Sequence, residues 1–203
     1  MLSDSYADEC AGRVRKAVDE KKPLEINSDW LEQNGTIHLS AADSDGNMAA
    51  LTLTHGGNFG ARVTVDGMGL VLGHGVSRFD PHPGRANSPG PHKRPLHNMV
   101  PTVVMRDGKP VLAVGARGGR RIPDAVLAVL TEFCGFKRSG PDSIEAARMH
   151  TEGGMRLQLD DRWSDPEREF FAGLGYETER ASVAIASAAS FDGGAESFVT
   201  AQR

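Results

Sequence analysis

The dipeptide Gly35-Thr36 marks a position where a nucleophile could be made. Cleavage of the bond between the two residues would place Thr36 at a chain start, where its free α-amine can act as the base for its own hydroxyl. The alternative is structural, because Thr36 is also a β-branched residue at the beginning of a strand-like run. Taken alone, the dipeptide favours the structural alternative, so the chemical interpretation depends on the segments around it.

The segment that contains Thr36 predicts a β-hairpin. Two runs with period-two alternation, residues 36–42 and 47–54, flank an Asp-Gly dipeptide that is typical of a tight turn. Threonines two positions apart on the second run share one face, because side chains alternate along a strand. Tight pairing around the turn would place Thr54 at the level of Thr36.

A glycine-rich loop at residues 115–119 lies between a predicted strand and a predicted helix at residues 124–133. Backbone N–H groups at such a helix start can stabilise an anion, as in a phosphate site or an oxyanion hole. The loop matches neither glycine pattern of nucleotide-binding proteins, and by itself it favours a tight strand-to-helix turn. Four arginines are candidates to bind a carboxylate or phosphate. Arg117, Arg120 and Arg121 lie in or directly after this loop, and Arg78 lies in an earlier segment. The alternative is that they are solvated charges.

Other reactive residue types give weaker signals. Three histidines share a Gly/Pro-rich loop without the spacing of a metal site, so we expect solvated or loop-packing side chains: His74, His82 and His92. His38 is expected to be a satisfied core residue. Cys10 and Cys134 are far apart, and we expect reduced, structural thiols, with Cys134 on the apolar side of its helix. The G-x-S-x-G motif of serine hydrolases does not occur.

Length and composition limit the classes of function. A chain of 203 residues fits one domain, or one domain with an appendage, and can bury a real core. The net charge of -4 provides no basic field for nucleic acid. The chain contains neither an apolar run of the roughly 20 residues that span a bilayer nor a signal-peptide pattern at its start. A cytoplasmic location is the default, with a periplasmic or extracellular one if an upstream part carries a signal.

The patterns along the chain predict a mixture of helices and strands. A helix at residues 3–20 has Ser3 or Asp4 as its cap. Residues 73–95 lack any periodic pattern, which is unusual in a compact domain and typical of functional or mobile segments. Further helices are expected at 124–133, 141–150 and 165–174, and further strands at 63–65, 68–72, 102–105, 111–114, 155–159 and 182–189.

Several motifs in this order resemble the small subunit of the gamma-glutamyltransferase family. They are Thr36-x-His38-x-Ser40, Asp45-Gly46-Asn47, Thr52-x-Thr54, Phe59-Gly60, Gly69-Leu70-Val71-Leu72, Lys93-Arg94-Pro95-Leu96, Met99-x-Pro101-Thr102 and Gly115-x-x-Gly118-Gly119-x-x-Ile122. Residues 1–35 resemble the tail of the family's large subunit. The resemblance therefore divides the chain into residues 1–35 and a small-subunit-like catalytic region at residues 36–203.

The resemblance implies an α+β fold, the small-subunit half of the αββα sandwich of N-terminal-nucleophile hydrolases. It also implies maturation by self-cleavage between Gly35 and Thr36. Thr36 would be the nucleophile, Thr54 would orient its hydroxyl or amine, and the N–H groups of Gly118 and Gly119 would form the oxyanion hole. The implied reaction is acyl transfer from, or hydrolysis of, gamma-glutamyl amides such as glutathione. It needs neither a metal nor an organic cofactor.

The substrate-binding residues depart from the family pattern. Arg78 stands where the family binds the substrate's α-amino group with an acidic residue, and His97-Asn98 replaces a Ser-Ser pair that holds its α-carboxylate. An arginine repels an ammonium group and attracts a carboxylate. A related amidohydrolase or acylase with a different acyl substrate is therefore the alternative.

The chain is also shorter than the family's large subunit alone. We expect a large-subunit-like chain as partner, or self-association, because one half of the sandwich would expose a broad apolar face. The other expected partner is a small-molecule substrate, and nucleic acid is not expected. A non-catalytic subunit or assembly protein remains the alternative from another class.

Overall fold

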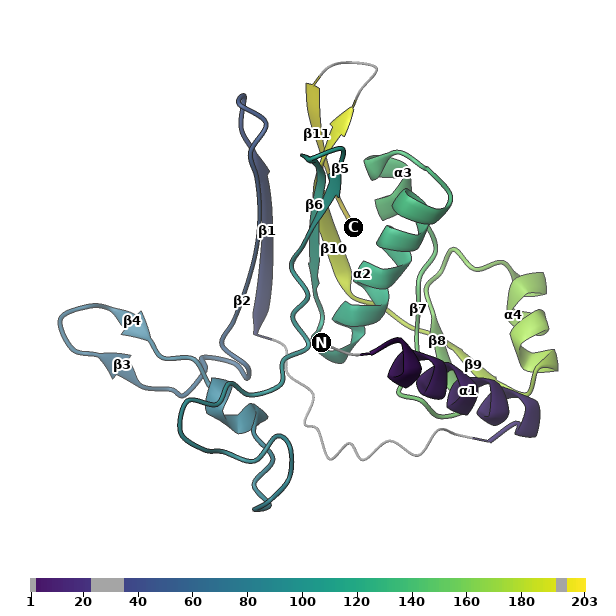
Figure 1. Ribbon diagram of the computed structural model, residues 1–203, viewed down its shortest axis with the longest axis horizontal. Coiled ribbons are helices and arrows are strands. Elements are labelled where there is room, and N and C mark those ends of the chain that lie inside the picture. The colour runs from purple at the N-terminus through teal and green to yellow at the C-terminus, as the bar shows by residue number, and fades with distance from the viewer. Residues whose placement is uncertain (1–2, 23–34, 193–196) are drawn as a thin grey trace. The chain divides into compact units, whose positions relative to one another are not determined.

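The computed structural model describes residues 3–22, 35–192 and 197–203 (Figure 1). The described residues form two compact units, one from residues 3–22 and 147–183 and the other from residues 35–146, 184–192 and 197–203. These units follow spatial contacts, whereas the expected division after residue 35 follows a cleavage point. That division therefore stays a prediction.

The predicted first hairpin is confirmed in the larger unit. Strands β1 (Thr36–Ala42) and β2 (Met48–Thr54) pair antiparallel along their whole length, from Thr36 opposite Thr54 to Ala42 opposite Met48. The Asp43 carboxylate closes the turn, because it accepts hydrogen bonds from the N–H groups of Asp45 and Asn47. The two threonines thus lie at the open end of the hairpin.

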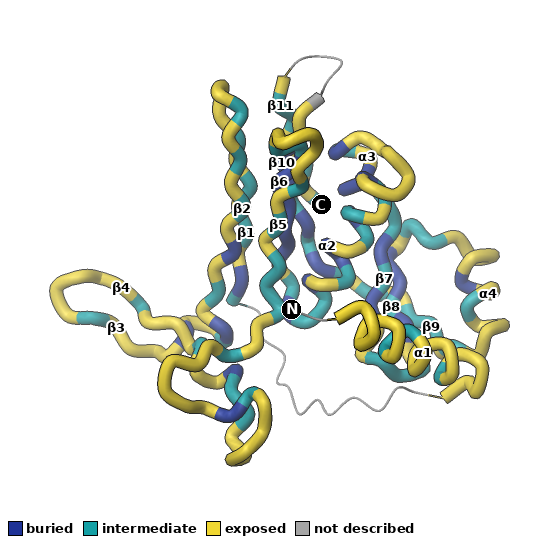
Figure 2. The backbone as a smooth tube through the Cα atoms, viewed as in Figure 1, coloured by how far each residue is buried: buried dark blue, intermediate teal, exposed yellow. Residues whose placement is uncertain are grey.

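A four-stranded antiparallel sheet stands beside this hairpin, with the order β11-β10-β6-β5. Its strands are β5 (Thr102–Arg106), β6 (Lys109–Arg117), β10 (Ile185–Asp192) and β11 (Ser197–Gln202). Three of them confirm predicted strands, and β11 was not predicted. Residues 112–116 of the central strand β6 are buried (Figure 2).

The two sheets face each other through small and polar side chains. The Ser40 hydroxyl donates to the Ser187 carbonyl oxygen over 3.3 Å. The His38 ring lies so close to Gly115 that a Cβ there would come within 2.3 Å of Cε1. Glycine at this position therefore allows the sheets to approach.

Helices cover the opposite face of the four-stranded sheet (Figure 1). They are α2 (Ile122–Leu130), a π-helical turn (Thr131–Gly135) and α3 (Gly140–Glu145). The shared core consists of buried apolar residues from β6, β10 and the helices, among them Leu112, Val114, Ile122, Val126, Val129 and Ile144. The unit is thus layered as hairpin, sheet and helices.

Three predictions in this region are corrected. The helix predicted at residues 124–133 is α2, which begins at Ile122 and ends at Leu130. The i→i+5 turn after it rotates the following residues around the helix axis. Cys134 is consequently exposed, so its predicted position on an apolar face is wrong. The helix predicted at 141–150 ends at Glu145, and Met149–His150 is strand β7.

The connection between the two sheets is largely irregular, as expected. Short strands β3 (Thr64–Val65) and β4 (Leu70–Val71) confirm a predicted pair. Within residues 73–95 the one helix or strand is η1 (Gly75–Arg78), a 3₁₀ turn. This segment carries Arg78 into a buried position.

The smaller unit contains α1 (Asp4–Glu20), β7, β8 (Arg156–Leu159), α4 (Asp165–Gly173) and β9 (Glu177–Arg180). Its sheet has the order β7-β8-β9, with β8 and β9 parallel. The Ser3 hydroxyl accepts from the Tyr6 N–H, which confirms the predicted cap of α1. Helix α4 and strand β8 were also predicted, whereas β9 was not. Among the described helices, none has the length and apolar character needed to cross a membrane.

Candidate active site

Thr36 is held at the open end of the first hairpin. It is 6% exposed, and its hydroxyl donates a hydrogen bond of 2.9 Å to the Thr54 hydroxyl on the paired strand. The contact follows from the register, because directly opposed residues bring their side chains together on one face. The predicted approach of Thr54 to Thr36 is confirmed.

The Thr54 hydroxyl links Thr36 to the peptide bond that precedes it. It accepts from the Gly56 N–H at 3.0 Å and donates to the Gly35 carbonyl oxygen at 3.3 Å. The same carbonyl oxygen accepts from the His55 N–H at 2.9 Å. Two donors therefore polarise the carbonyl of the Gly35-Thr36 bond, next to the Thr36 hydroxyl.

Gly35 is clamped by the loop that follows β2. Its N–H donates to the Gly56 carbonyl oxygen at 3.0 Å. A Cβ at this position would lie 3.0 Å from the carbonyl oxygens of both Gly56 and Gly57. A larger residue would have to displace backbone, so glycine lets the chain pass close to the second strand.

His38 supports the hairpin two residues after Thr36. Its Nδ1 lies 2.7 Å from the Thr52 hydroxyl and its Nε2 lies 2.9 Å from the Ser40 hydroxyl. Burial lowers the pKa of His38, so the neutral ring is favoured, with one nitrogen donating and the other accepting. The prediction of a satisfied core histidine is confirmed.

Gly118 and Gly119 follow directly after β6, before α2. Gly118 has a φ of 136°, and a Cβ there would lie 2.7 Å from the Cα of Ala184. Gly119 has a φ of 64°. Outside regular helices and strands, the described backbone hydrogen bonds include none donated by the N–H of either glycine.

The glycine pair and Thr36 lie at the same end of the two facing sheets. The turns of the β1–β2 and β5–β6 hairpins line one common cleft at the opposite end. Thr36 and Arg117 are each at the other end of their strands, because β1 begins at Thr36 and β6 ends at Arg117. The fold thus brings the nucleophile candidate and the glycine N–H groups to one end of the sandwich.

The predicted substrate-binding residues gather beside Gly119. The Asn98 Nδ2 donates to the Gly119 carbonyl oxygen. Desolvation, with a contribution from the positive charge of Arg78, lowers the pKa of His97, which precedes Asn98 in the chain. Arg78 itself is 4% exposed, so its interpretation as an exposed loop charge is wrong. Burial, with a contribution from Arg120, lowers the pKa of Arg78.

Sequence reasoning missed the backbone groups that hold Gly35. His55 and Gly56 act through backbone N–H and carbonyl groups, which cannot be recognised from the type of side chain. The Gly-Gly dipeptide at 56–57 was the available signal, since it indicates close backbone approach.

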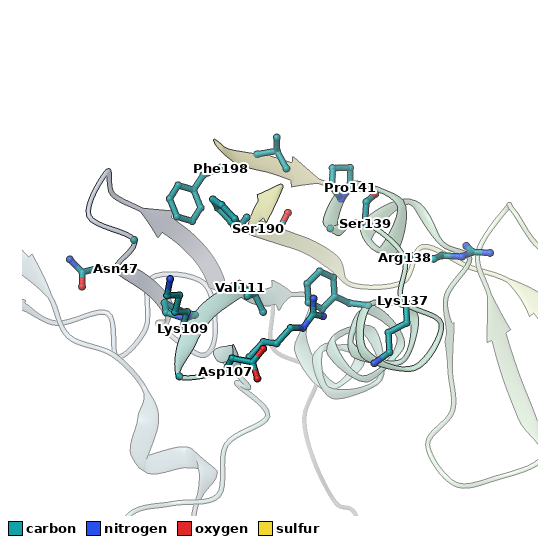
Figure 3. Close-up of a pocket in the computed structure, with 18 of the residues that line it drawn as sticks. Asn47, Asp107, Lys109, Val111, Lys137, Arg138, Ser139, Pro141, Ser190 and Phe198 are labelled. Carbon is teal, nitrogen blue, oxygen red and sulfur yellow. The ribbon is translucent and has the colours of Figure 1, made fainter. Parts of the chain in front are cut away.

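No predicted site residue lines the cleft at the far end, which has a volume of about 1460 Å³ and is shown in Figure 3. In the described ranges, no group of three or more His, Cys, Asp or Glu side chains could hold a metal ion.

Comparison with known proteins shows where this arrangement occurs. The gamma-glutamyltranspeptidase family model matches residues 1–201. An acylase proenzyme, ACY 1, from a Pseudomonas species is 31% identical over 180 residues, which are 89% of this chain and 32% of that protein. The protein named "Putative inactive glutathione hydrolase 4" of Arabidopsis thaliana is 31% identical over 166 residues, which are 74% of this chain and 87% of that protein.

The structural comparison agrees. A gamma-glutamyltranspeptidase from Pseudomonas nitroreducens, solved in complex with L-DON, superimposes with a TM-score of 0.70 at 28% identity, over 81% of this chain and 93% of that chain. The predicted α+β fold of N-terminal-nucleophile hydrolases is therefore confirmed. This chain spans about a third of the acylase proenzyme that it matches. On the family model and these similarities, the chain belongs to the gamma-glutamyltranspeptidase family.

Proposed function

We propose that the chain is the nucleophile-bearing part of an amidohydrolase or acyltransferase whose Thr36 is freed by cleavage of the Gly35-Thr36 bond. The observation that carries this proposal is the hydrogen-bonded sequence from the Thr36 hydroxyl to the Thr54 hydroxyl to the Gly35 carbonyl oxygen. It joins the attacking group, a proton acceptor and the target carbonyl. Family membership supports the same chemistry.

Self-cleavage begins when the Thr36 Oγ1 attacks the Gly35 carbonyl carbon. The negative charge that develops on the carbonyl oxygen is stabilised by the His55 N–H and the Thr54 hydroxyl, which already donate to it. The C–N bond breaks, the Thr36 nitrogen takes the proton, and an ester joins Gly35 to the Thr36 oxygen. Water then hydrolyses that ester, which leaves a Gly35 carboxylate and a free Thr36 amine.

The mature reaction uses the groups that cleavage leaves behind. The Thr36 hydroxyl attacks the amide carbonyl of the acyl donor while the α-amine takes the proton and passes it to the leaving amine. Water or an amino acceptor then releases the acyl group from its ester with Thr36. Thr54 holds the attacking hydroxyl in place, and burial of Thr36 limits its alternative rotamers.

The N–H groups of Gly118 and Gly119 are the proposed oxyanion donors of this second reaction. Their positive φ angles turn the backbone sharply between β6 and α2. Outside regular helices and strands, the described backbone hydrogen bonds include none donated by their N–H groups. Two such donors stabilise a tetrahedral intermediate as its charge forms. The acyl group is a gamma-glutamyl group or a related one, since this chain resembles both gamma-glutamyltranspeptidases and an acylase.

The outer face of the first hairpin has the exposed apolar side chains expected of an interface with a large protein partner. Four apolar side chains on that face are each at least half exposed: Ile37, Leu39, Leu51 and Leu53. Contiguous apolar surface of this kind marks an interface. A large-subunit-like chain, or a second copy of this chain, would cover it and complete the fourth layer of the sandwich.

Peptide mass mapping after exposure to an acyl donor tests the proposal. The protein is incubated with gamma-glutamyl p-nitroanilide and with acyl p-nitroanilides, both alone and together with any large-subunit-like chain encoded beside it. We expect the acyl mass on the peptide that starts at Thr36, together with release of nitroaniline. An acyl mass on another residue, or no acyl mass with either preparation, would contradict the proposal.

A second candidate, a non-catalytic subunit, is favoured by one observation. A relative of similar length from Arabidopsis thaliana carries "inactive" in its name. This candidate predicts that the chain remains continuous through Gly35-Thr36, takes up no acyl group and forms a stable complex on gel filtration. Uptake of an acyl group on Thr36 would exclude it.

A further inference from the structure

The cleft of about 1460 Å³ lies at the end of the larger unit opposite Thr36. Its walls come from the turns of the β1–β2 and β5–β6 hairpins, the start of α3, and strands β10 and β11. Strand β1 has seven residues, which at roughly 3.3 Å each separate the cleft from Thr36 by about 20 Å. A ligand in the cleft would therefore not touch the proposed acyl-transfer site.

Three cations line the cleft without an ion pair among the described residues. Arg106 and Lys109 stand directly opposite each other at the turn of the β5–β6 hairpin, and Lys137 follows the π-helical turn. The described ion pairs include none to these three side chains, whereas Arg138, also in the lining, is paired with Glu132. Like charges in directly opposed positions destabilise a strand pair. An anion in the cleft would offset the repulsion between Arg106 and Lys109.

The backbone around these cations has an unusual conformation. Lys137 has a φ of 58°, a left-handed conformation that costs free energy in a residue with a Cβ. Both backbone strain and π-helical turns are over-represented at functional sites. The acids in the lining, Asp45 and Asp107, are exposed residues of the two hairpin turns and are fewer than the cations. The lining is thus positive, although the chain has a net charge of -4.

Aromatic side chains line another part of the cleft. Phe191 and Phe198 are opposite each other on β10 and β11, with ring centroids 5.3 Å apart, and Phe191 is 41% exposed. Phe133 adds a third ring to the lining. Figure 3 shows Lys109 and Lys137 toward one side of the cleft and Phe198 toward the other. Concave sites that combine apolar walls with a few charged groups are typical of small-molecule binding.

We propose that this cleft binds an amphipathic anion, namely a carboxylate with an acyl or aryl tail. The carboxylate lies among Arg106, Lys109 and Lys137, and the tail lies against the phenylalanines. A guanidinium holds a carboxylate with two parallel N–H···O bonds, and the two ammonium groups add attraction. The Arg106 guanidinium carbon is 5.8 Å from the centroid of the Phe133 ring, so charge and apolar surface adjoin. The cleft exceeds the roughly 300–1,000 Å³ of a typical small-molecule site, so the ligand fills part of it and water the rest.

Three probes separate the contributions of charge and tail. The full chain is titrated in a calorimeter with octanoate, with octanol, which has the tail without the charge, and with propionate, which has the charge without the long tail. We expect octanoate to bind at least about tenfold more tightly than either, because each of the others lacks one contribution. Equal affinity for octanoate and octanol would overturn the proposal, since it would indicate unspecific binding to exposed apolar surface.

Amide chemical shifts locate the bound octanoate. In two-dimensional NMR spectra of the full chain, the largest shifts should occur at Gly108, Lys137 and Ser139, which line the cleft. Shifts confined to the exposed apolar face of the first hairpin would contradict the proposal. The titration is repeated in the presence of the proposed large-subunit-like chain. Loss of octanoate binding in that complex would assign the cleft to the partner chain and overturn the proposal.

Matched removals of charge test the cations. Lys137→Asn removes one charge and introduces a residue that tolerates a positive φ. Arg62→Asn does the same outside the cleft, because Arg62 is exposed and has a φ of 56°. We expect Lys137→Asn, and separately Arg106→Gln, to weaken octanoate binding about three- to tenfold, and Arg62→Asn to change it less than about twofold. Equal weakening in Arg62→Asn would assign the attraction to overall charge and contradict the proposal.

Discussion

The two sides of the proposed site differ in whether their buried polar groups have hydrogen-bond partners. At the open end of the first hairpin, Thr36 is buried with its hydroxyl bonded, and each polar neighbour of Gly35 has a partner. Around Arg78, a charge is buried and its Nε has no described partner. A satisfied network holds one geometry, whereas an unsatisfied cation is stabilised by a ligand.

The difference separates two groups of residues that the sequence analysis treated differently. The end with Thr36 carries residues through which the sequence resembles the family, and the register of the hairpin brings Thr36 and Thr54 together. The end with Arg78 carries Arg78, His97 and Asn98, where the sequence analysis expects a departure from the family's pattern. Reaction and recognition can therefore be tested separately, by variants on one side that leave the other intact.

The largest expected effect comes from removing the nucleophile. Thr36→Ala should abolish cleavage at residue 35 and lower anilide hydrolysis at least about 10⁴-fold, because no other group can form the ester. Intact mass and initial rates measure both effects. Thr36→Ser, which keeps a hydroxyl, should restore cleavage. Full activity in Thr36→Ala would contradict the assignment of Thr36 as the nucleophile.

Loss of the bridging hydroxyl should have a smaller effect. Thr54→Val keeps the side-chain shape but removes the bonds to Thr36 and to the Gly35 carbonyl oxygen. We expect cleavage to slow about 100-fold, the size of effect seen when one oxyanion donor is lost. The rate is followed by gel electrophoresis of freshly purified protein. Ser44→Ala at the exposed turn is the control, and an equal slowing there would contradict a specific role for Thr54.

Substitution in the glycine turn at residues 118–119 should lower the stability of the folded protein. In Gly118→Ala the new Cβ would meet Ala184 at 2.7 Å with φ at 136°, and we expect a loss of roughly 2–4 kcal/mol in the free energy of unfolding. Gly108→Ala shares a positive φ, 76°, but faces open space, so it should lose roughly 1–2 kcal/mol. Urea unfolding measures both. Equal losses would mean that the close approach to Ala184 is not significant.

The smallest expected effect is a dependence of stability on pH. Burial lowers the pKa of His38 in the folded protein, so the unfolded chain binds more protons once the pH falls below about 6.5. Stability is complete above that value and declines as the pH falls toward the folded pKa. Tm values between pH 7.5 and 5.5 should show this decline, which should weaken in His38→Gln. A decline of the same slope in both proteins would assign it to other groups, His97 first.

The sequence predicted the hairpins well because they depend on local patterns. Alternation and turn residues sufficed for β1, β2, β5 and β6, and the register then brought Thr54 to Thr36. Strands β9 and β11 were missed, because neither shows a clear alternation of apolar and polar residues. The burial of Arg78 could not be predicted, since it depends on how a segment without a periodic pattern folds in space.

The most direct test of this account is the intact mass of the purified protein. Autocatalytic maturation predicts that the chain separates between Gly35 and Thr36, with residues 36–203 as one product, and that Thr36→Ala stays continuous under the same conditions. A wild-type chain that remains continuous after long incubation, both alone and with the proposed large-subunit-like chain, would contradict the central claim.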